Sequence, residues 1–309
     1  MIVSLPDTST QEVSKKLVRM RNTGGEVTVG RVLTLIIDTE PGEVAETAVT
    51  VANQASREHP CRVIVVIRGD RSAGDRLDAE IRVGGDAGAS EVVLLTLFGE
   101  MAEHAHSVVT PFLLPDTPVV TWWPGRAPDR PAEDRLGRLA SRRITDARTA
   151  DDPGSFLAAR RLGYSPGDTD LAWSAITPWR ATLVSALDRP PHLPVVSATV
   201  TGPAVNPAAD LFAGWLAQAL DVPVLRETGR WHVSLLRPDG AVEMTVDRSG
   251  GLLRSPGHPD GRAVFARRTT AQCLAEELRR LDADVVYRAA LQGLSGVTRQ
   301  PYSPTSGRS

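Results

Sequence analysis

The feature that most limits the fold of this chain is a series of short apolar runs separated by helical segments. Residues 63–67 are all Val or Ile, and residues 92–95 read Val-Val-Leu-Leu. Such runs are typical of strands that helices cover on both faces, because a strand with one wet face alternates apolar and polar residues. Between residues 44 and 55 the apolar positions recur with the helical period instead. This alternation of strand and helix predicts an α/β fold.

The order of these segments predicts a three-layer α/β domain with a mixed, largely parallel sheet. Residues 77–83 alternate apolar and polar side chains and lead to the strand at 91–98 with no helix between them. Because parallel neighbours need a long crossover, we expect this pair to be antiparallel. The other expected elements of this domain are strands at 27–37, 62–68, 118–123 and 142–146 and helices at 43–55 and 100–114.

The length of the chain, 309 residues, exceeds what one hydrophobic core usually supports, so two domains are expected. The N-terminal α/β domain is predicted to span residues 1–187, with trailing helices in its last part. Residues 188–194 are rich in proline, which resists helix and sheet, and are the expected linker. A smaller α+β domain, closed by two helices, is expected at 195–294, and the Ser-, Gly- and Pro-rich residues 295–309 are expected to be a disordered tail.

The charge balance narrows the classes of partner. Lys and Arg number 35 and Asp and Glu 37, a formal net charge of −2. This balance argues against binding to nucleic acid or to an anionic membrane surface. The N-terminus lacks the apolar segment of a signal peptide, and no apolar stretch approaches the roughly 18 residues that a membrane span needs. We therefore expect a cytoplasmic protein without a membrane partner.

Tryptophan is concentrated in two places. Four of the six tryptophans lie in residues 119–125 and 170–180. Trp is the residue most enriched at the energetic centres of protein interfaces. Trp122 and Trp123 end a predicted strand at Pro-Gly, so the alternation of side chains places one indole on each face of that strand. Burial between the sheet and its covering helices explains the same residues equally well, and the sequence leaves both interpretations open.

The two cysteines, Cys61 and Cys273, lie far apart and in no CxxC motif, which argues against a disulfide framework or a zinc site. Cys61 follows His59 and precedes Arg62, cations that would lower the pKa of a thiol, so Cys61 is a weak candidate for redox chemistry. The alternative is a structural cysteine buried at the start of a strand. No metal site is expected, because the spacing of His104 and His106 points them to different faces of a helix.

No catalytic or cofactor motif is present in the sequence. The glycines of residues 84–88 follow a predicted strand, but they match neither GxGxxG nor the P-loop pattern. The HExxH and GxSxG patterns do not occur either. We therefore interpret residues 84–88 as a turn and predict a protein without a bound cofactor.

Several runs, taken in order, resemble the OpcA family of glucose-6-phosphate dehydrogenase assembly proteins of actinobacteria and cyanobacteria. The resemblance covers Met1 to about Leu294 and is strongest in residues 25–180. Every basic residue other than Lys15 and Lys16 is Arg or His, and this composition fits the actinobacterial branch. The runs that carry it are Glu58-His59-Pro60-Cys61-Arg62-Val63-Ile64, Val83-Gly84-Gly85-Asp86-Ala87-Gly88, Trp122-Trp123-Pro124-Gly125, Arg142-Arg143-Ile144-Thr145-Asp146, Asp170-Leu171-Ala172-Trp173 and Thr177-Pro178-Trp179-Arg180.

The resemblance implies a protein that is not an enzyme. Such a protein binds glucose-6-phosphate dehydrogenase, promotes its active oligomer and so supports the oxidative pentose phosphate pathway and NADPH supply. In the cyanobacterial branch cysteines are linked to control by thioredoxin, and neither cysteine of this chain matches that set. The residues expected to form or to hold the docking surface are Trp122, Trp123, Arg142, Arg143, Trp173, Trp179 and Arg180.

One function of another class remains open at the level of sequence. An α/β enzyme or sensor that binds a sugar phosphate or a nucleotide could use Arg62, Arg68 or the glycines of residues 84–88.

Overall fold

The computed structural model describes residues 1–24, 32–83, 91–247, 250–263 and 267–300. The predicted turn at 84–88 and the first part of the predicted strand at 27–37 lie outside these ranges. The chain forms two compact units, and each unit is made of three separate segments. Unit 1 consists of Met1–Ala150, Ser165–Leu171 and Thr269–Ala283, and unit 2 of Asp151–Tyr164, Ala172–Arg268 and Asp284–Ser309.

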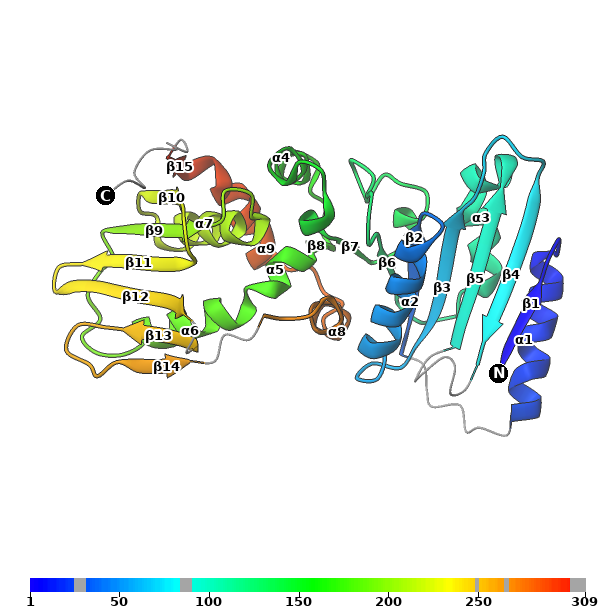
Figure 1. Ribbon diagram of the computed structural model, residues 1–309, viewed down its shortest axis with the longest axis horizontal. Helices are drawn as coiled ribbons and strands as arrows, with labels where there is room; N and C mark the ends of the chain where they lie inside the picture. The colour runs from blue at the N-terminus through cyan, green and yellow to red at the C-terminus, as the bar shows by residue number, and fades with distance from the viewer. Residues whose placement is uncertain (25–31, 84–90, 248–249, 264–266, 301–309) are drawn as a thin grey trace, which may run out of the picture. The chain divides into compact units, whose positions relative to one another are not determined.

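Unit 1 contains an eight-stranded sheet in the order β1-β4-β5-β3-β2-β6-β7-β8 (Figure 1). In this order, each of the neighbouring strands β5, β3, β2, β6, β7 and β8 runs parallel to the next. Strand β4 is antiparallel to both β1 and β5. The sheet is thus mixed and largely parallel, and the antiparallel pair expected from residues 77–98 is confirmed. The strands are β1 (Ile2–Leu5), β2 (Leu33–Thr39), β3 (Cys61–Arg68), β4 (Arg76–Arg82), β5 (Glu91–Phe98), β6 (Val119–Trp122), β7 (Arg142–Thr145) and β8 (Asp168–Asp170).

Helices cover both faces of this sheet, which explains why its central strands are apolar at nearly every position. On one face, α1 (Thr10–Gly24) and α3 (Ala105–Val109) pack with Ile64, Val66 and Val93 in one core cluster. On the other face, α2 (Glu43–Ala55) buries a row of alanines and Val49 and packs against α8 (Thr270–Arg279). The helix predicted at 100–114 is broken into 3₁₀ turns on both sides of α3. Pro111 lies in the last of these turns and has no N–H with which to continue an α-helix.

Successive strands of the chain are added on opposite sides of β2. The chain passes from β2 through α2 to β3 on one side, and β6 later pairs with the opposite edge of β2. In open α/β sheets, the loops that leave the carboxyl ends of two such strands part from each other and open a crevice, which is the usual place for a ligand. The carboxyl ends of β2, β3 and β6 are therefore the first place to look for a functional site.

Unit 2 contains a seven-stranded sheet in the order β14-β13-β12-β11-β9-β10-β15. Strand β10 runs parallel to both β9 and β15, and the other pairs of this sheet are antiparallel. Its strands alternate buried and partly exposed side chains, as in a sheet with one wet face. The strands are β9 (Ser197–Gly202), β10 (Val224–Thr228), β11 (His232–Arg237), β12 (Gly240–Asp247), β13 (Gly250–Arg254), β14 (Gly261–Ala263) and β15 (Val297–Arg299). The helices of this unit are α4 (Pro153–Gly163), α5 (Leu171–Ala175), α6 (Thr177–Leu187), α7 (Pro207–Leu220) and α9 (Val285–Gly293).

These units divide the chain differently from the predicted boundaries at 187 and 195. Helices α4 and α6, which we expected to trail the N-terminal domain, pack in unit 2. Helix α8, which we expected to close the C-terminal domain, packs in unit 1. An amphipathic pattern shows that a helix needs a covering surface but does not identify that surface. Part of the predicted tail is also ordered, since β15 at Val297–Arg299 pairs in parallel with β10.

Candidate functional site

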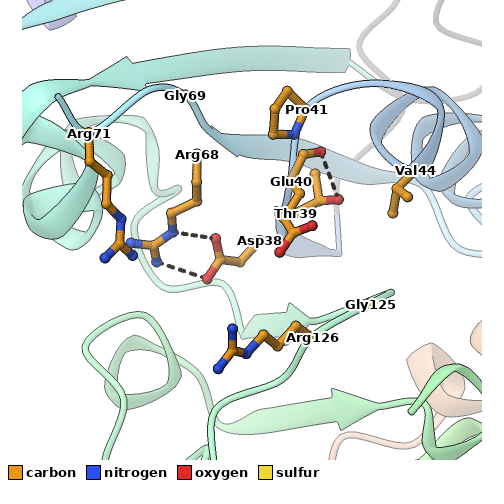
Figure 2. Close-up of a pocket in the computed structure, with 10 residues that line it drawn as sticks. All are labelled: Asp38, Thr39, Glu40, Pro41, Val44, Arg68, Gly69, Arg71, Gly125 and Arg126. Atoms are coloured by element: carbon orange, nitrogen blue, oxygen red, sulfur yellow. Dashed lines mark hydrogen bonds and ion pairs between the residues drawn. The ribbon is translucent and has the colours of Figure 1, made fainter. Parts of the chain in front are cut away.

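A pocket of about 720 Å³ lies at the carboxyl ends of β2 and β3 and beside the loop that follows β6 (Figure 2). Its volume is within the usual range of roughly 300–1,000 Å³ for small-molecule sites. It occupies the crevice that the strand order predicts. The lining residues are Asp38, Thr39, Glu40, Pro41, Val44, Arg68, Gly69, Arg71, Gly125 and Arg126.

The inner part of the pocket is fixed by a network around Asp38. Arg68 donates from Nε to Oδ1 and from Nη2 to Oδ2 of Asp38, each at 2.9 Å. The indole Nε1 of Trp123 donates to Asp38 Oδ2 at 3.1 Å. Burial alone would lower the pKa of Arg68, but the hydrogen bonds and charge of Asp38 raise it above its ordinary value. Arg68 is thus permanently charged and neutralised by Asp38.

The outer part of the pocket comes from three loops. Gly42 starts α2 with φ 99° and ψ −149°, a backbone conformation that favours glycine. Arg71 follows β3 and pairs with Glu103 at 2.8 Å, and both of these side chains are more than half exposed. Arg126 follows β6, is exposed, and has no ion pair among the residues that the structure describes. In Figure 2 Arg71 lies beside Arg68, and Arg126 lies on the other side of the Asp38–Arg68 pair.

The two paired tryptophans are both buried, with 1% of each side chain exposed. Trp122 is the last residue of β6, where it pairs with Ile37 of β2. Trp123 lies next to Gly137, where any side chain would collide with the backbone oxygen of Pro131 and press on the indole ring. The glycine therefore allows the loop after β6 to close over Trp123. The buried interpretation is the one that the structure favours for this pair, and Trp123 supports the pocket from below through Asp38.

Arg142 and Arg143 are buried as well and serve two different connections. Arg142 donates to the carboxylate of Glu277 on α8 and, at 2.6 Å, to the backbone oxygen of Asp282. Arg143 pairs with Asp168 at 2.5 Å and so joins β7 to β8. Both guanidinium groups thus hold unit 1 together and are turned away from solvent.

The remaining predicted residues lie in unit 2. The indole of Trp173 is buried and donates to Asp284 Oδ2 at 2.9 Å. The guanidinium carbon of Arg180 lies 3.5 Å from the centre of the same indole, a cation–π contact. Trp179 is partly exposed and meets Trp231 edge to face, with 5.0 Å between the ring centres. Trp179 and Arg180 are therefore the two members of the predicted set that reach the surface.

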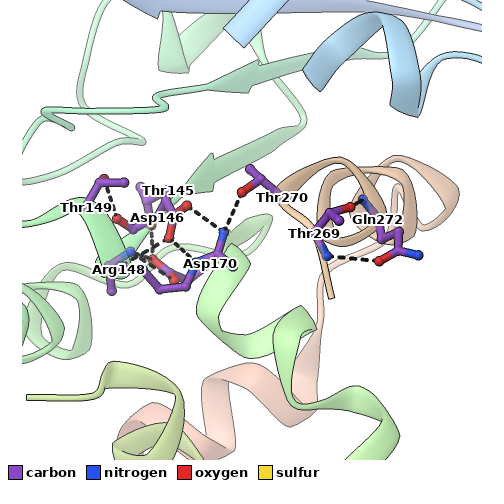
Figure 3. A network of polar contacts seen from close by, with 9 residues as sticks. Thr145, Asp146, Arg148, Thr149, Asp170, Thr269, Thr270 and Gln272 are labelled. Atoms are coloured by element: carbon purple, nitrogen blue, oxygen red, sulfur yellow. Dashed lines mark hydrogen bonds and ion pairs between the residues drawn. The ribbon is translucent and has the colours of Figure 1, made fainter. Parts of the chain in front are cut away.

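A second polar cluster, shown in Figure 3, is centred on the buried residues Thr145, Asp146 and Asp170. The carboxylate of Asp170, fully buried, accepts from Thr145 Oγ1 at 2.6 Å and from the backbone N–H of Ala147. Arg148 makes two hydrogen bonds of 2.7 Å to Asp146. Burial would lower the pKa of Arg148, but the hydrogen bonds and charge of Asp146 raise it. Arg148 pairs with Asp146, and hydrogen bonds satisfy the carboxylate of Asp170, so this cluster stabilises the fold.

Cys61 begins β3 and Cys273 lies on α8, and both cysteines are buried and form no disulfide. Arg62, expected to polarise Cys61, instead pairs with Glu91 at 2.9 Å and donates to the backbone oxygen of Phe112. Cys61 thus has the environment of a structural cysteine. Among the described residues, no three His, Cys, Asp or Glu side chains gather where they could hold a metal ion.

Sequence reasoning named Arg68 but missed Asp38, Arg71 and Arg126. A signal was present, since each of these residues stands at or just after the end of a predicted strand. In a parallel sheet such ends meet along one edge. What the sequence did not reveal was which strand lies beside which, and this order brings the three together.

Two family models match consecutive parts of the chain. The first, described as the N-terminal domain of a glucose-6-phosphate dehydrogenase subunit, matches residues 52–162. The second, described as the C-terminal domain of that subunit, matches residues 166–291. The chain belongs to the OpcA family. The membership expected from the tryptophan and arginine runs is thereby confirmed, and the OpcA models span most of both units.

Other comparisons add little to the OpcA assignment. No curated protein matches the chain. A crystal structure of glucose-6-phosphate 1-dehydrogenase from Mycobacterium avium aligns over 86% of this chain and 93% of its own, with 10% sequence identity and a TM-score of 0.42. A TM-score this low supports no argument about fold or function. Within the described residues, no helix is both long and apolar enough to cross a membrane.

Proposed function

We propose that this protein is a non-enzymatic, cytoplasmic partner of glucose-6-phosphate dehydrogenase that promotes the active oligomer of the enzyme. The observation that carries the proposal is the match of residues 52–162 and 166–291 to the two domains of a glucose-6-phosphate dehydrogenase subunit. Through the dehydrogenase it would support the oxidative pentose phosphate pathway and the supply of NADPH.

Activation of this kind needs only a difference in affinity. A partner that binds the active state of the dehydrogenase more tightly than the inactive state shifts the population toward the active one. A coupling free energy of about 1–3 kcal/mol would change the apparent affinity of the enzyme for its substrate by roughly 5- to 150-fold. Neither a catalytic group nor a cofactor on the partner is required.

The predicted interface residues take two roles in this proposal. Trp122, Trp123, Arg142 and Arg143 are buried in unit 1 and Trp173 in unit 2, so each of them supports the surface of its own unit. Trp179 and Arg180 lie on α6 and reach solvent, so they contact the dehydrogenase. A partly exposed indole beside a guanidinium group is the kind of anchor that dominates protein interfaces.

The experiment is reconstitution with the glucose-6-phosphate dehydrogenase of the same organism. The two proteins are mixed, and size-exclusion chromatography with light scattering measures the mass of the complex. We expect co-elution and a larger share of the higher oligomer, and the outcome that rejects the proposal is separate elution of the two proteins. Trp179→Ala should weaken the complex by about tenfold or more, the usual effect of removing such an anchor.

The matched control is Val184→Ala, which truncates another side chain of α6, 54% exposed in the free chain. We expect this variant to bind the dehydrogenase like the wild type. Equal binding by Trp179→Ala and the wild type would reject the contact role of Trp179 but not the proposed function.

A further inference from the structure

The pocket at the carboxyl ends of β2 and β3 has features that the proposed function does not use. It lies wholly within unit 1, and its guanidinium groups differ in how they are engaged. Arg68 is neutralised by Asp38 through two hydrogen bonds. Arg126 has no ion pair within the described part of the chain, and Arg71 pairs only with the exposed Glu103. Exposed ion pairs contribute little free energy, so a ligand could take the place of Glu103.

The charges that face the pocket favour an anion. Its charged lining residues are three arginines and two carboxylates. Asp38 neutralises Arg68, and Glu103 pairs with Arg71 from outside the lining, so Arg126 is the lining arginine that has no ion pair within the described part of the chain. A guanidinium group offers a planar fork of N–H donors that matches phosphate oxygens in pairs. Arg71 and Arg126 both line this pocket and can therefore bind one phosphate group together.

The rest of the lining indicates more than a free phosphate ion. The volume of about 720 Å³ exceeds the space that a single phosphate ion fills. Pro41 and Val44 supply an apolar wall, and the exposed carboxylate of Glu40 can accept hydrogen bonds from hydroxyl groups. These surroundings suit a phosphate group attached to a polyhydroxylated body such as a sugar or a ribose.

We propose that this pocket binds a phosphate ester of a sugar or nucleoside, with Arg71 and Arg126 clamping the phosphate. The Asp38–Arg68–Trp123 network provides a rigid floor that holds the loops after β2, β3 and β6 in place. The inference goes beyond the proposed function, since binding of this ligand needs no dehydrogenase.

The test is isothermal titration calorimetry on the full chain alone. The probes are glucose 6-phosphate and AMP, which distinguish a sugar source from a nucleoside source, with glucose, adenosine and inorganic phosphate as references. We expect at least one ester to bind with a dissociation constant below about 1 mM, and its unphosphorylated counterpart and inorganic phosphate to bind at least tenfold more weakly. Absence of binding by both esters, or equal binding by inorganic phosphate, would overturn the proposal.

Variants localise the binding to the pocket. Arg126→Ala and Arg71→Ala should each weaken ester binding by about tenfold or more, the usual effect of losing hydrogen bonds to a charged group. Both side chains are exposed, so circular dichroism and thermal unfolding should match those of the wild type. The matched control is Arg130→Ala in the same loop, an arginine outside the pocket that pairs with Glu133 at 2.8 Å.

Arg130→Ala should bind the ester like the wild type. Unchanged binding in both Arg126→Ala and Arg71→Ala would overturn the proposal. Because no dehydrogenase is present, neither outcome depends on the function proposed above.

Discussion

The buried ion pair between Arg142 and Glu277 yields a quantitative prediction. These residues are 1% and 3% exposed and connect β7 to α8 across 135 positions of sequence. Glu277→Leu leaves the guanidinium group of Arg142 buried without its counter-charge, which should lower the free energy of unfolding by about 3–5 kcal/mol. The double variant Arg142→Met with Glu277→Leu replaces both charges by apolar groups and should lie within about 1 kcal/mol of the wild type.

The backbone oxygen of Asp282, which Arg142 also contacts, belongs to an exposed residue and can bind water in the double variant. The double-mutant cycle should therefore give a coupling energy of at least about 2 kcal/mol, since any loss from Arg142→Met alone adds to that from Glu277→Leu. The assay is urea-induced unfolding followed by far-ultraviolet circular dichroism, with the free energy from linear extrapolation. The control is the exposed pair Arg279–Glu58, also made by α8, whose loss should cost no more than about 1 kcal/mol. A double variant as unstable as the sum of its single variants would refute this reasoning.

Two further predictions concern single side chains. Trp123→Phe should destabilise the protein by about 1–2 kcal/mol more than Trp122→Phe in the same unfolding assay, because only Trp123 loses a hydrogen bond to the Asp38 carboxylate; equal losses would contradict this. Hydrogen bonds from Ser155, chiefly from its hydroxyl, hold the pKa of Asp152 below its ordinary value of 3.8. The stability that these hydrogen bonds supply is therefore present above pH 3.8 and is lost as the pH falls through the lowered pKa. Ser155→Ala should move the pKa of Asp152 upward, as measured by NMR titration of the carboxyl carbon, and an unchanged titration would contradict the assignment.

The sequence was informative wherever burial was apolar. Residues 61–68 and 91–98 form buried strands because nearly every side chain is apolar. No helical segment separates residues 77–83 from 91–98, and this absence identified the antiparallel pair of β4 and β5. Strand β8 escaped prediction because Asp168, Thr169 and Asp170 are polar yet buried. Partners from β7 and the following turn, 23 to 25 residues away, satisfy the buried carboxylates of Asp168 and Asp170.

The candidate site was predictable in its parts but not in its assembly. The run Trp122-Trp123-Pro124-Gly125 identified the family, yet its tryptophans are buried supports. Arg126, the next residue, is the exposed one that faces the pocket. Composition cannot separate these roles, since the position of a side chain relative to the sheet edge depends on the strand order. The same order brings Asp38 within hydrogen-bonding distance of Trp123, 85 residues later.

The most direct test of the central claim is the initial rate of glucose-6-phosphate dehydrogenase at a substrate concentration well below its KM, measured as this protein is added. The account predicts a saturable rise in rate of about fivefold or more, the lower end of a coupling of about 1–3 kcal/mol. It also predicts a shift of the dehydrogenase to its larger oligomer over the same range of added protein. An unchanged rate at every ratio of the two proteins, with no change in the mass of the dehydrogenase, would contradict the account.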